Sequence, residues 1–96
     1  MLINAAERGD EAVVEALVAA GAAIDSETLT GWTALMVAAA RGREGSVRAL
    51  VRAGANLEAR NAQGQTALSL AQQKRHARVA RLLIVANNNV RLLRRD

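Results

Sequence analysis

A spacing of 33 residues recurs along this chain. Residues of the same type fall at this interval in five pairs: Gly9 and Gly42, Gly21 and Gly54, Gly31 and Gly64, Thr33 and Thr66, and Leu17 and Leu50. A fixed period of this size indicates structural units that stack in a row, each packing against its neighbours. Chains of this kind usually present a surface to a partner and do not carry out chemistry in a pocket.

The apolar residues of the chain are mostly small. Hydrophobic residues make up 51% of the sequence, but there is no Phe, Tyr or Cys and only one Trp. A core of Ala, Leu and Val requires close approach of the backbone segments, which thin helices allow. The absence of Pro also favours a mostly helical chain. The length of 96 residues suits a single domain.

The best-formed unit begins at Thr33. This threonine can cap a helix over 34–41, and Gly42 can end that helix in a left-handed conformation. A second helix over 44–53 has apolar residues at helical spacing and stops at Gly54. An extended segment and a β-turn complete the unit. The same template predicts further helices over 2–8, 11–20, 67–74 and 77–86.

The ordered landmarks resemble those of the ankyrin repeat. The consensus D-x-x-G-x-T-P-L-H-x-A-A-x-x-G aligns with TLTGWTALMVAAARG at 28–42 and with NAQGQTALSLA at 61–71, and GANLEA at 54–59 follows the second helix. The resemblance covers residues 2 to about 86. It implies an all-α fold, an ankyrin-type α-solenoid of about three helix-turn-helix repeats joined by β-turn fingers. The implied repeats are 1–26, 27–59 and 60–86, each to within a few residues.

The chain departs from the family pattern at several positions. Met36 and Ser69 stand where the family has a His that bonds across to neighbouring loops, and Ser69 is expected to supply part of that network. Arg75 replaces a helix-ending Gly, and a left-handed conformation there costs about 1 kcal/mol more than it would for Gly. Asn87 replaces the final Gly and tolerates the same conformation.

The last ten residues, 87–96, are predicted to be a basic C-terminal tail. Asn87–Asn89 are expected to form a turn. Residues 90–95 are expected to form a short amphipathic helix that either folds back on the last repeat or frays.

In the family that the sequence resembles, partners bind the β-turn fingertips and the concave face made by the first helices. Carried over by position, the candidate partner-binding residues are Glu27, Leu29, Thr30, Trp32, Ala40, Arg41, Arg60, Gln63, Gln65, Gln73 and Lys74. Trp32 is the only aromatic residue. It is expected either to anchor a partner or to lie flat on the neighbouring finger and cover Leu29 or backbone.

Charge is distributed unevenly along the chain. Residues 1–40 carry six acids and one Arg, a balance of −5, whereas residues 59–96 carry eight bases and one acid, a balance of +7. Glu15, Arg48 and Arg81 share one repeat position, which predicts either a solvated face with a Glu15–Arg48 contact or a basic stripe.

Three functions remain open at this stage. The favoured one is a monomeric, intracellular module, cytoplasmic or nuclear, that binds a protein. The first alternative is a binder of anionic surfaces, nucleic acid or acidic lipid, through the basic C-terminal half. The second is a designed or trimmed repeat scaffold without a dedicated partner.

Catalysis is not expected. His76 is the only His, it stands where the family has a turn residue, and there is no Cys, no metal-ligand cluster and no G-x-x-x-x-G-K-[ST] loop. We therefore expect no enzymatic activity and no cofactor or metal. No apolar stretch reaches the roughly 20 residues that span a bilayer.

Overall fold

The computed structural model describes residues 1–93, with side chains through Asn88. Within this range the chain forms three successive helix pairs. One isolated antiparallel β-bridge joins Glu27 to Thr33. The helices are α1 (Leu2–Arg8), α2 (Glu11–Ala19), α3 (Ala34–Arg41), α4 (Glu44–Arg52), α5 (Ala67–Gln73) and α6 (Ala77–Leu93). We call the pairs α1–α2, α3–α4 and α5–α6 unit 1, unit 2 and unit 3.

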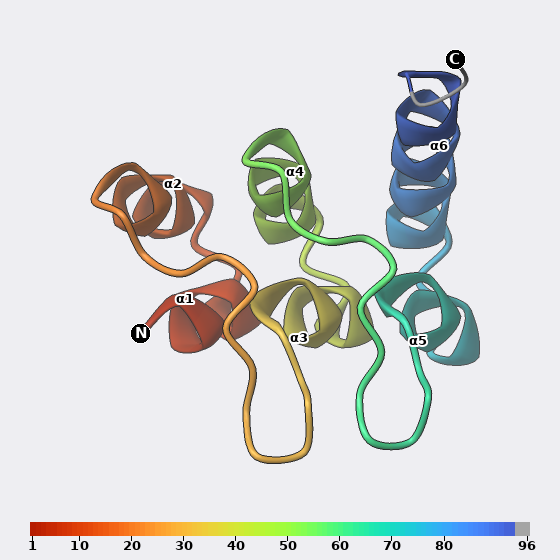
Figure 1. Cartoon of the computed structure of the whole chain (residues 1–96), viewed down its shortest axis with the longest axis horizontal. Coiled ribbons are helices and arrows are strands. Elements are labelled where there is room, and N and C mark those ends of the chain that lie inside the picture. Colours follow the sequence, from red (N-terminus) through yellow and green to blue (C-terminus); the bar gives the residue numbers. More distant parts are fainter. Residues whose placement is uncertain (94–96) are drawn as a thin grey trace.

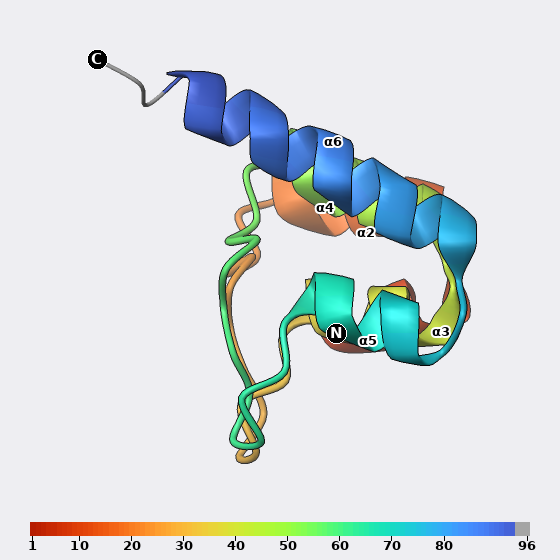
Figure 2. The ribbon, with the colours of Figure 1, turned by 90° about the vertical axis from the view of Figure 1, so that its right-hand side faces the viewer.

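The helices lie in two layers. The first helices of the units, α1, α3 and α5, lie side by side in one layer, and α2, α4 and α6 form the other (Figures 1 and 2). The two long loops between units project beyond the first-helix layer as parallel fingers (Figure 2). The predicted all-α repeat architecture is confirmed.

Threonines begin the first helices of units 2 and 3, as predicted. The amide of Met36 donates to Thr33 Oγ1 at 3.3 Å, and the amide of Ser69 donates to Thr66 Oγ1 at 3.1 Å. Ser69 Oγ in turn accepts from the amide of Thr66 at 2.9 Å. Ser69 therefore stabilises the start of its own helix by a reciprocal cap, and its bonds do not cross to a neighbouring loop.

The core fills the space between the two layers with small side chains. Leu35, Leu50 and Leu70 are at most 2% exposed, and alanines such as Ala38 lie between them. Met36 is 1% exposed and fills core volume at the position where the family has His. The small residues allow neighbouring helices to approach closely, which is the condition that the composition predicts.

Each boundary between units is closed by the same polar contact. Arg43 Nε donates to the carbonyl oxygen of Glu7 at 2.9 Å, which joins unit 2 to unit 1. Thirty-three residues later, His76 Nε2 lies 3.1 Å from the carbonyl oxygen of Ala40, which joins unit 3 to unit 2. Because a carbonyl oxygen only accepts, Nε2 carries the proton in this bond. His76 is a structural residue at a unit boundary.

These two side chains lie over glycines of the preceding unit. A Cβ placed on Gly42 would come within 2.7 Å of His76 Nδ1, and one placed on Gly9 would come within 2.8 Å of Arg43 Cδ. The glycine that ends each first helix is therefore needed for space as well as for its positive φ. Arg75 holds the equivalent position in unit 3, with φ of 62°, and its side chain is exposed.

The sequence prediction fails after residue 86. Helix α6 runs without interruption through Asn87–Asn89 to Leu93, so the predicted turn and the separate helix over 90–95 are wrong. Asn87 is helical and not left-handed. Asn lowers helix propensity by less than about 1 kcal/mol per residue, and this segment contains no Gly or Pro to end the helix. The expected start of the tail at residue 87 falls inside α6, and residues 94–96 lie outside the described part.

Gly42→Ala tests the dual role of the boundary glycine. The added Cβ would displace the His76 ring, and φ of +70° disfavours alanine, so we expect the free energy of unfolding to fall by about 2–3 kcal/mol in urea titrations. Gly54→Ala is the matched control, because its φ is +90° but a Cβ would meet nothing within 4 Å. We expect a loss of about 1 kcal/mol there. Equal losses would contradict the role of His76.

Arg75→Gly should stabilise the protein. Arg75 has φ of 62°, a conformation that costs a side chain about 1 kcal/mol, so the free energy of unfolding should rise by about 0.5–1 kcal/mol. Lys74→Gly is the control, since Lys74 has φ of −89° and gains nothing from glycine. Circular dichroism during urea unfolding measures both, and a loss of stability for Arg75→Gly would refute the strain.

Candidate partner-binding surface

The loops between units form two fingers of the same design. Finger 1 spans residues 27–33 and finger 2 spans residues 60–66. In finger 1 the amide of Thr28 donates to the carbonyl oxygen of Trp32 at 3.0 Å, and in finger 2 the amide of Asn61 donates to that of Gln65 at 3.1 Å. Each finger is therefore a closed turn, as the glycines at their tips predict.

One side chain in each finger holds the turn in place from inside. Thr28 Oγ1 accepts from the amides of Thr30 and Trp32 at 3.3 and 3.1 Å. Asn61, 33 residues after Thr28, acts in the same way: its Oδ1 accepts from the amides of Gln63 and Gln65, both at 3.0 Å. These local bonds are typical of Asn, Ser and Thr at turns. Neither residue is among the candidates from sequence. Their shared repeat position and their side-chain oxygens are nevertheless the features that indicate this turn-stabilising role.

The two fingers are joined to each other. The amide of Ala62 donates to the carbonyl oxygen of Thr30 at 2.9 Å. A Cβ on Gly31 would lie 3.0 Å from Asn61 Cα, so glycine there lets the two backbones touch. The fingers thus form one ordered surface and not two independent loops.

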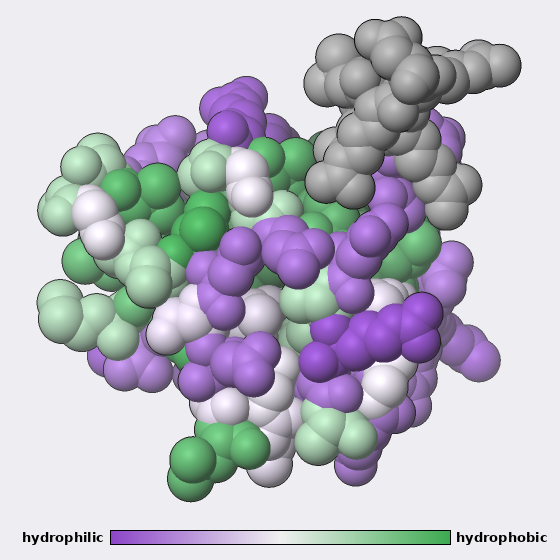
Figure 3. Space-filling model, in the orientation of Figure 1, coloured by the Kyte–Doolittle hydropathy of each residue, from purple (hydrophilic) through white to green (hydrophobic). Residues whose placement is uncertain are grey.

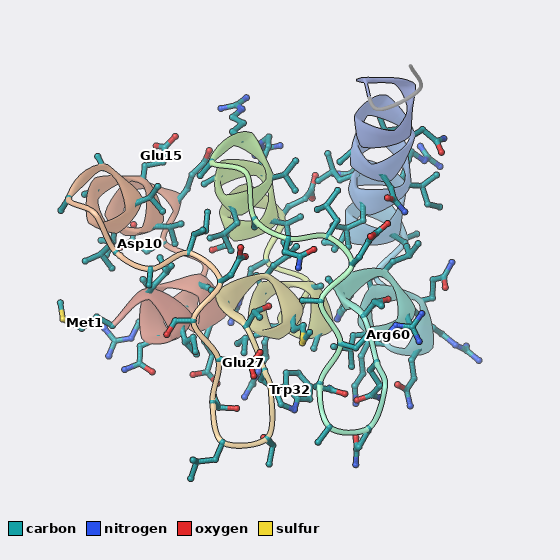
Figure 4. All side chains as sticks on the ribbon, viewed as in Figure 1. Met1, Asp10, Glu15, Glu27, Trp32 and Arg60 are labelled. Atoms are coloured by element: carbon teal, nitrogen blue, oxygen red, sulfur yellow. The ribbon has the colours of Figure 1, made fainter. Side chains whose placement is uncertain are left out.

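The structure distinguishes the two large apolar candidates, Trp32 and Leu29. The Trp32 side chain points from finger 1 toward finger 2, is half-buried and packs against the edge of the core (Figure 4). Leu29 is fully exposed, so of the two surfaces that Trp32 was expected to cover if it packs locally, Leu29 is excluded. The tip of finger 1 is correspondingly hydrophobic in the space-filling view (Figure 3). Trp32 is in the position of a support, and Leu29 is the apolar tip.

The ends of the first helices lie next to one another and carry paired polar groups. Arg41 Nη2 is 2.8 Å from Glu7 Oε2, and both side chains are about half exposed. A surface pair of this kind contributes at most about 1 kcal/mol to stability. Gln65 Nε2 donates to Gln73 Oε1 at 3.1 Å, which links finger 2 to the end of α5.

The structure thus places the predicted residues in two groups. Residues that are exposed to solvent are Glu27, Leu29, Thr30, Arg41, Arg60, Gln63, Gln73 and Lys74. Residues that are only partly exposed are Trp32, Ala40 and Gln65. Ala40 contributes its carbonyl oxygen to the unit boundary, so its backbone is already engaged.

The second-helix layer pairs its charges differently from the prediction. Arg48 Nη2 lies 3.8 Å from Glu11 Oε1, so the expected Glu15–Arg48 contact is wrong. Glu15 is exposed and lies on α2, far from the fingers (Figure 4). The acidic partner of Arg48 thus lies one helical turn before the position that the repeat register suggested.

Within residues 1–93 no group of three or more acidic or imidazole side chains is placed to hold a metal ion. None of the described helices combines the length and apolar character that crossing a membrane requires.

Comparison with known families agrees with this geometry. No curated protein sequence matches the chain. A family model described as ankyrin repeats, in 3 copies, matches residues 2–96, a range that extends past the limit near residue 86 inferred from the landmarks. The chain therefore belongs to the ankyrin-repeat family, whose members are generally non-catalytic protein–protein interaction modules.

Proposed function

We propose that this chain is a non-catalytic, monomeric module that binds a protein partner with its fingers and first-helix ends. The observation that carries the proposal is Leu29, a fully exposed leucine at the tip of a finger whose backbone is held by Thr28. An apolar side chain in this position gains by entering a pocket on a partner.

Order in the fingers supports the proposal energetically. A loop that is already fixed loses less conformational entropy when a partner binds, so more of the contact energy appears as affinity. The bond between Ala62 and Thr30 extends this order across both fingers. Trp32 adds to this order by packing against the edge of the core at the base of the fingers.

Charge on this surface favours a partner with a polar, partly acidic rim. Arg41 is compensated by Glu7, whereas Arg60 and Lys74 are exposed and have no ion-pair partner among the described residues. Glu27 adds an acid on finger 1. Charges at the rim of an interface act mainly on association rate and specificity, so we assign Leu29 the larger share of affinity.

The cellular setting is part of the same proposal. The chain contains no Cys, which fits a reducing compartment, so we place its action inside the cell, in the cytoplasm or nucleus. The non-catalytic assignment is supported by His76, whose Nε2 is occupied by the Ala40 carbonyl.

Leu29→Ser tests the proposed contact. Proteins captured from a lysate on the immobilised wild-type chain are identified, and the dissociation constant of each purified candidate is then measured by calorimetry. We expect Leu29→Ser to weaken binding of the partner by about tenfold or more without lowering the melting temperature, because the side chain touches nothing in the free chain. Arg60→Ala and Lys74→Ala should chiefly slow association.

Glu15→Gln is the control, since Glu15 is exposed on α2. A partner whose affinity responds to Glu15→Gln and ignores Leu29→Ser, Arg60→Ala and Lys74→Ala would overturn the proposed surface.

Trp32→Ala separates support from contact. Because the ring is half-buried between the fingers, we expect the free energy of unfolding to fall by about 1–2 kcal/mol. Calorimetric unfolding measures this loss. Unchanged stability together with lost partner binding would show that Trp32 is a direct anchor instead.

A further inference from the structure

A groove between α4 and α6 lies outside the proposed finger surface. It has a volume of about 380 Å³, which is within the size range of ligand pockets. Its lining comes from the two second helices and consists of Glu44, Arg78, Arg81, Leu82 and Val85. The four residues from α6 follow one another at i, i+3, i+4 and i+7, so they form a single stripe along the helix.

The groove lies where unit 3 differs from unit 2 in the size and polarity of equivalent residues. Gly45 of α4 allows close approach to α2, since a Cβ there would lie 2.8 Å from Glu11 Oε1. Arg78 holds that position in α6, and its side chain is 84% exposed with Nη1 4.0 Å from Glu44 Oε2. Arginine cannot fit into the closed contact that glycine makes, so α4 and α6 are held apart on this side.

Two further replacements give the groove its apolar character. Leu82 stands where unit 2 has Ala49, which is 4% exposed, and Val85 stands where unit 2 has the exposed Arg52. Val85 is 53% exposed, and Leu82 is half-buried. A branched apolar side chain that is left half in water on the surface of a helix gains by being covered.

The charge of the groove indicates what covers it. Two guanidinium groups, of Arg78 and Arg81, border the apolar pair, against the single carboxylate of Glu44. Arg81 has no ion-pair partner among the described residues. An acidic occupant is therefore favoured, and the apolar stripe requires that it also carry aliphatic side chains at helical spacing. Nucleic acid fits less well, because the groove has no aromatic residue on which bases stack.

We propose that the α4–α6 groove binds an acidic amphipathic helix of a partner protein. The leucine-like side chains of that helix cover Leu82 and Val85, and its carboxylates pair with Arg78 and Arg81. This is helix-in-groove recognition, on a surface distinct from the fingers, and it does not depend on the function proposed for them.

The test uses a defined probe and the full chain. The probe is a synthetic peptide of about 14 residues with leucines at i, i+3, i+4 and i+7 and glutamates at most other positions. Its binding is followed by fluorescence anisotropy and by amide chemical shifts of the isotope-labelled chain. We expect saturable binding with a dissociation constant of about 100 μM or tighter, and shifts that concentrate on residues 78–85.

Variants of the groove give the expected losses. Arg78→Gln combined with Arg81→Gln should weaken binding by about tenfold or more, through loss of both charge pairs. Val85→Ser, which removes the apolar side chain without adding charge, should weaken it comparably. Arg52→Gln is the matched control, because Arg52 is exposed on α4 and does not line the groove, and it should leave the dissociation constant unchanged. Melting curves check that each variant is folded.

Several results would overturn the proposal. One is the absence of saturable shifts in residues 78–85 at about 1 mM peptide. Equal binding of a peptide of the same composition with its leucines scattered around the helix would show that charge alone is recognised. Tighter binding of duplex DNA or of phosphatidylserine vesicles than of the peptide, lost in the double Arg variant, would assign the groove to anionic surfaces. Shifts confined to residues 27–33 and 60–66 would place the peptide on the fingers.

Discussion

The stack depends on one contact that occurs at both unit boundaries. In each case an Arg or His follows the tight turn between the two helices of a unit. Its side chain lies over the glycine in the tight turn of the preceding unit and donates a hydrogen bond to a backbone carbonyl oxygen of that unit. Arg43 does so toward Glu7, and His76 does so toward Ala40. Because the bond joins side chain to backbone, it does not require a particular side chain on the accepting residue. The distance between units, and hence between fingers, is set by this contact together with the small residues of the core.

The parts of the fold that could be predicted are those in which a local rule and the repeat period agree. Thr33 and Thr66 begin helices because each places a capping oxygen at the expected register position. Arg75 keeps the positive φ of the repeat position although a side chain disfavours it. The end of α6 could not be predicted in the same way. Asn87–Asn89 resemble a turn only when judged by residue type, and their small helical penalty does not stop a helix that is already formed.

The candidate site was predictable in position and not in detail. Its residues came from the fold register, which determines where the fingers and helix ends lie. The contact between the two fingers determines which of the neighbouring apolar residues points outward. The distance between the fingers cannot be derived from a single sequence. The sequence therefore left open whether Trp32 anchors a partner or packs locally, whereas the structure shows Trp32 half-buried against the core and Leu29 exposed. The pairing of Arg48 with Glu11 is likewise a contact between helices of different units, and the repeat register alone does not specify it.

Bonds that join one unit to the next connect residues at nearly constant separation along the chain. Asn56 bonds to Asp25 at 31 positions, Arg41 to Glu7 at 34 and Arg43 to Glu7 at 36. A chain whose stabilising contacts all close loops of similar, moderate length pays the same entropic penalty at each step and needs no single long-range encounter. In such an arrangement folding can begin at any helix pair and extend to the neighbouring pair, because each pair contacts only its neighbours.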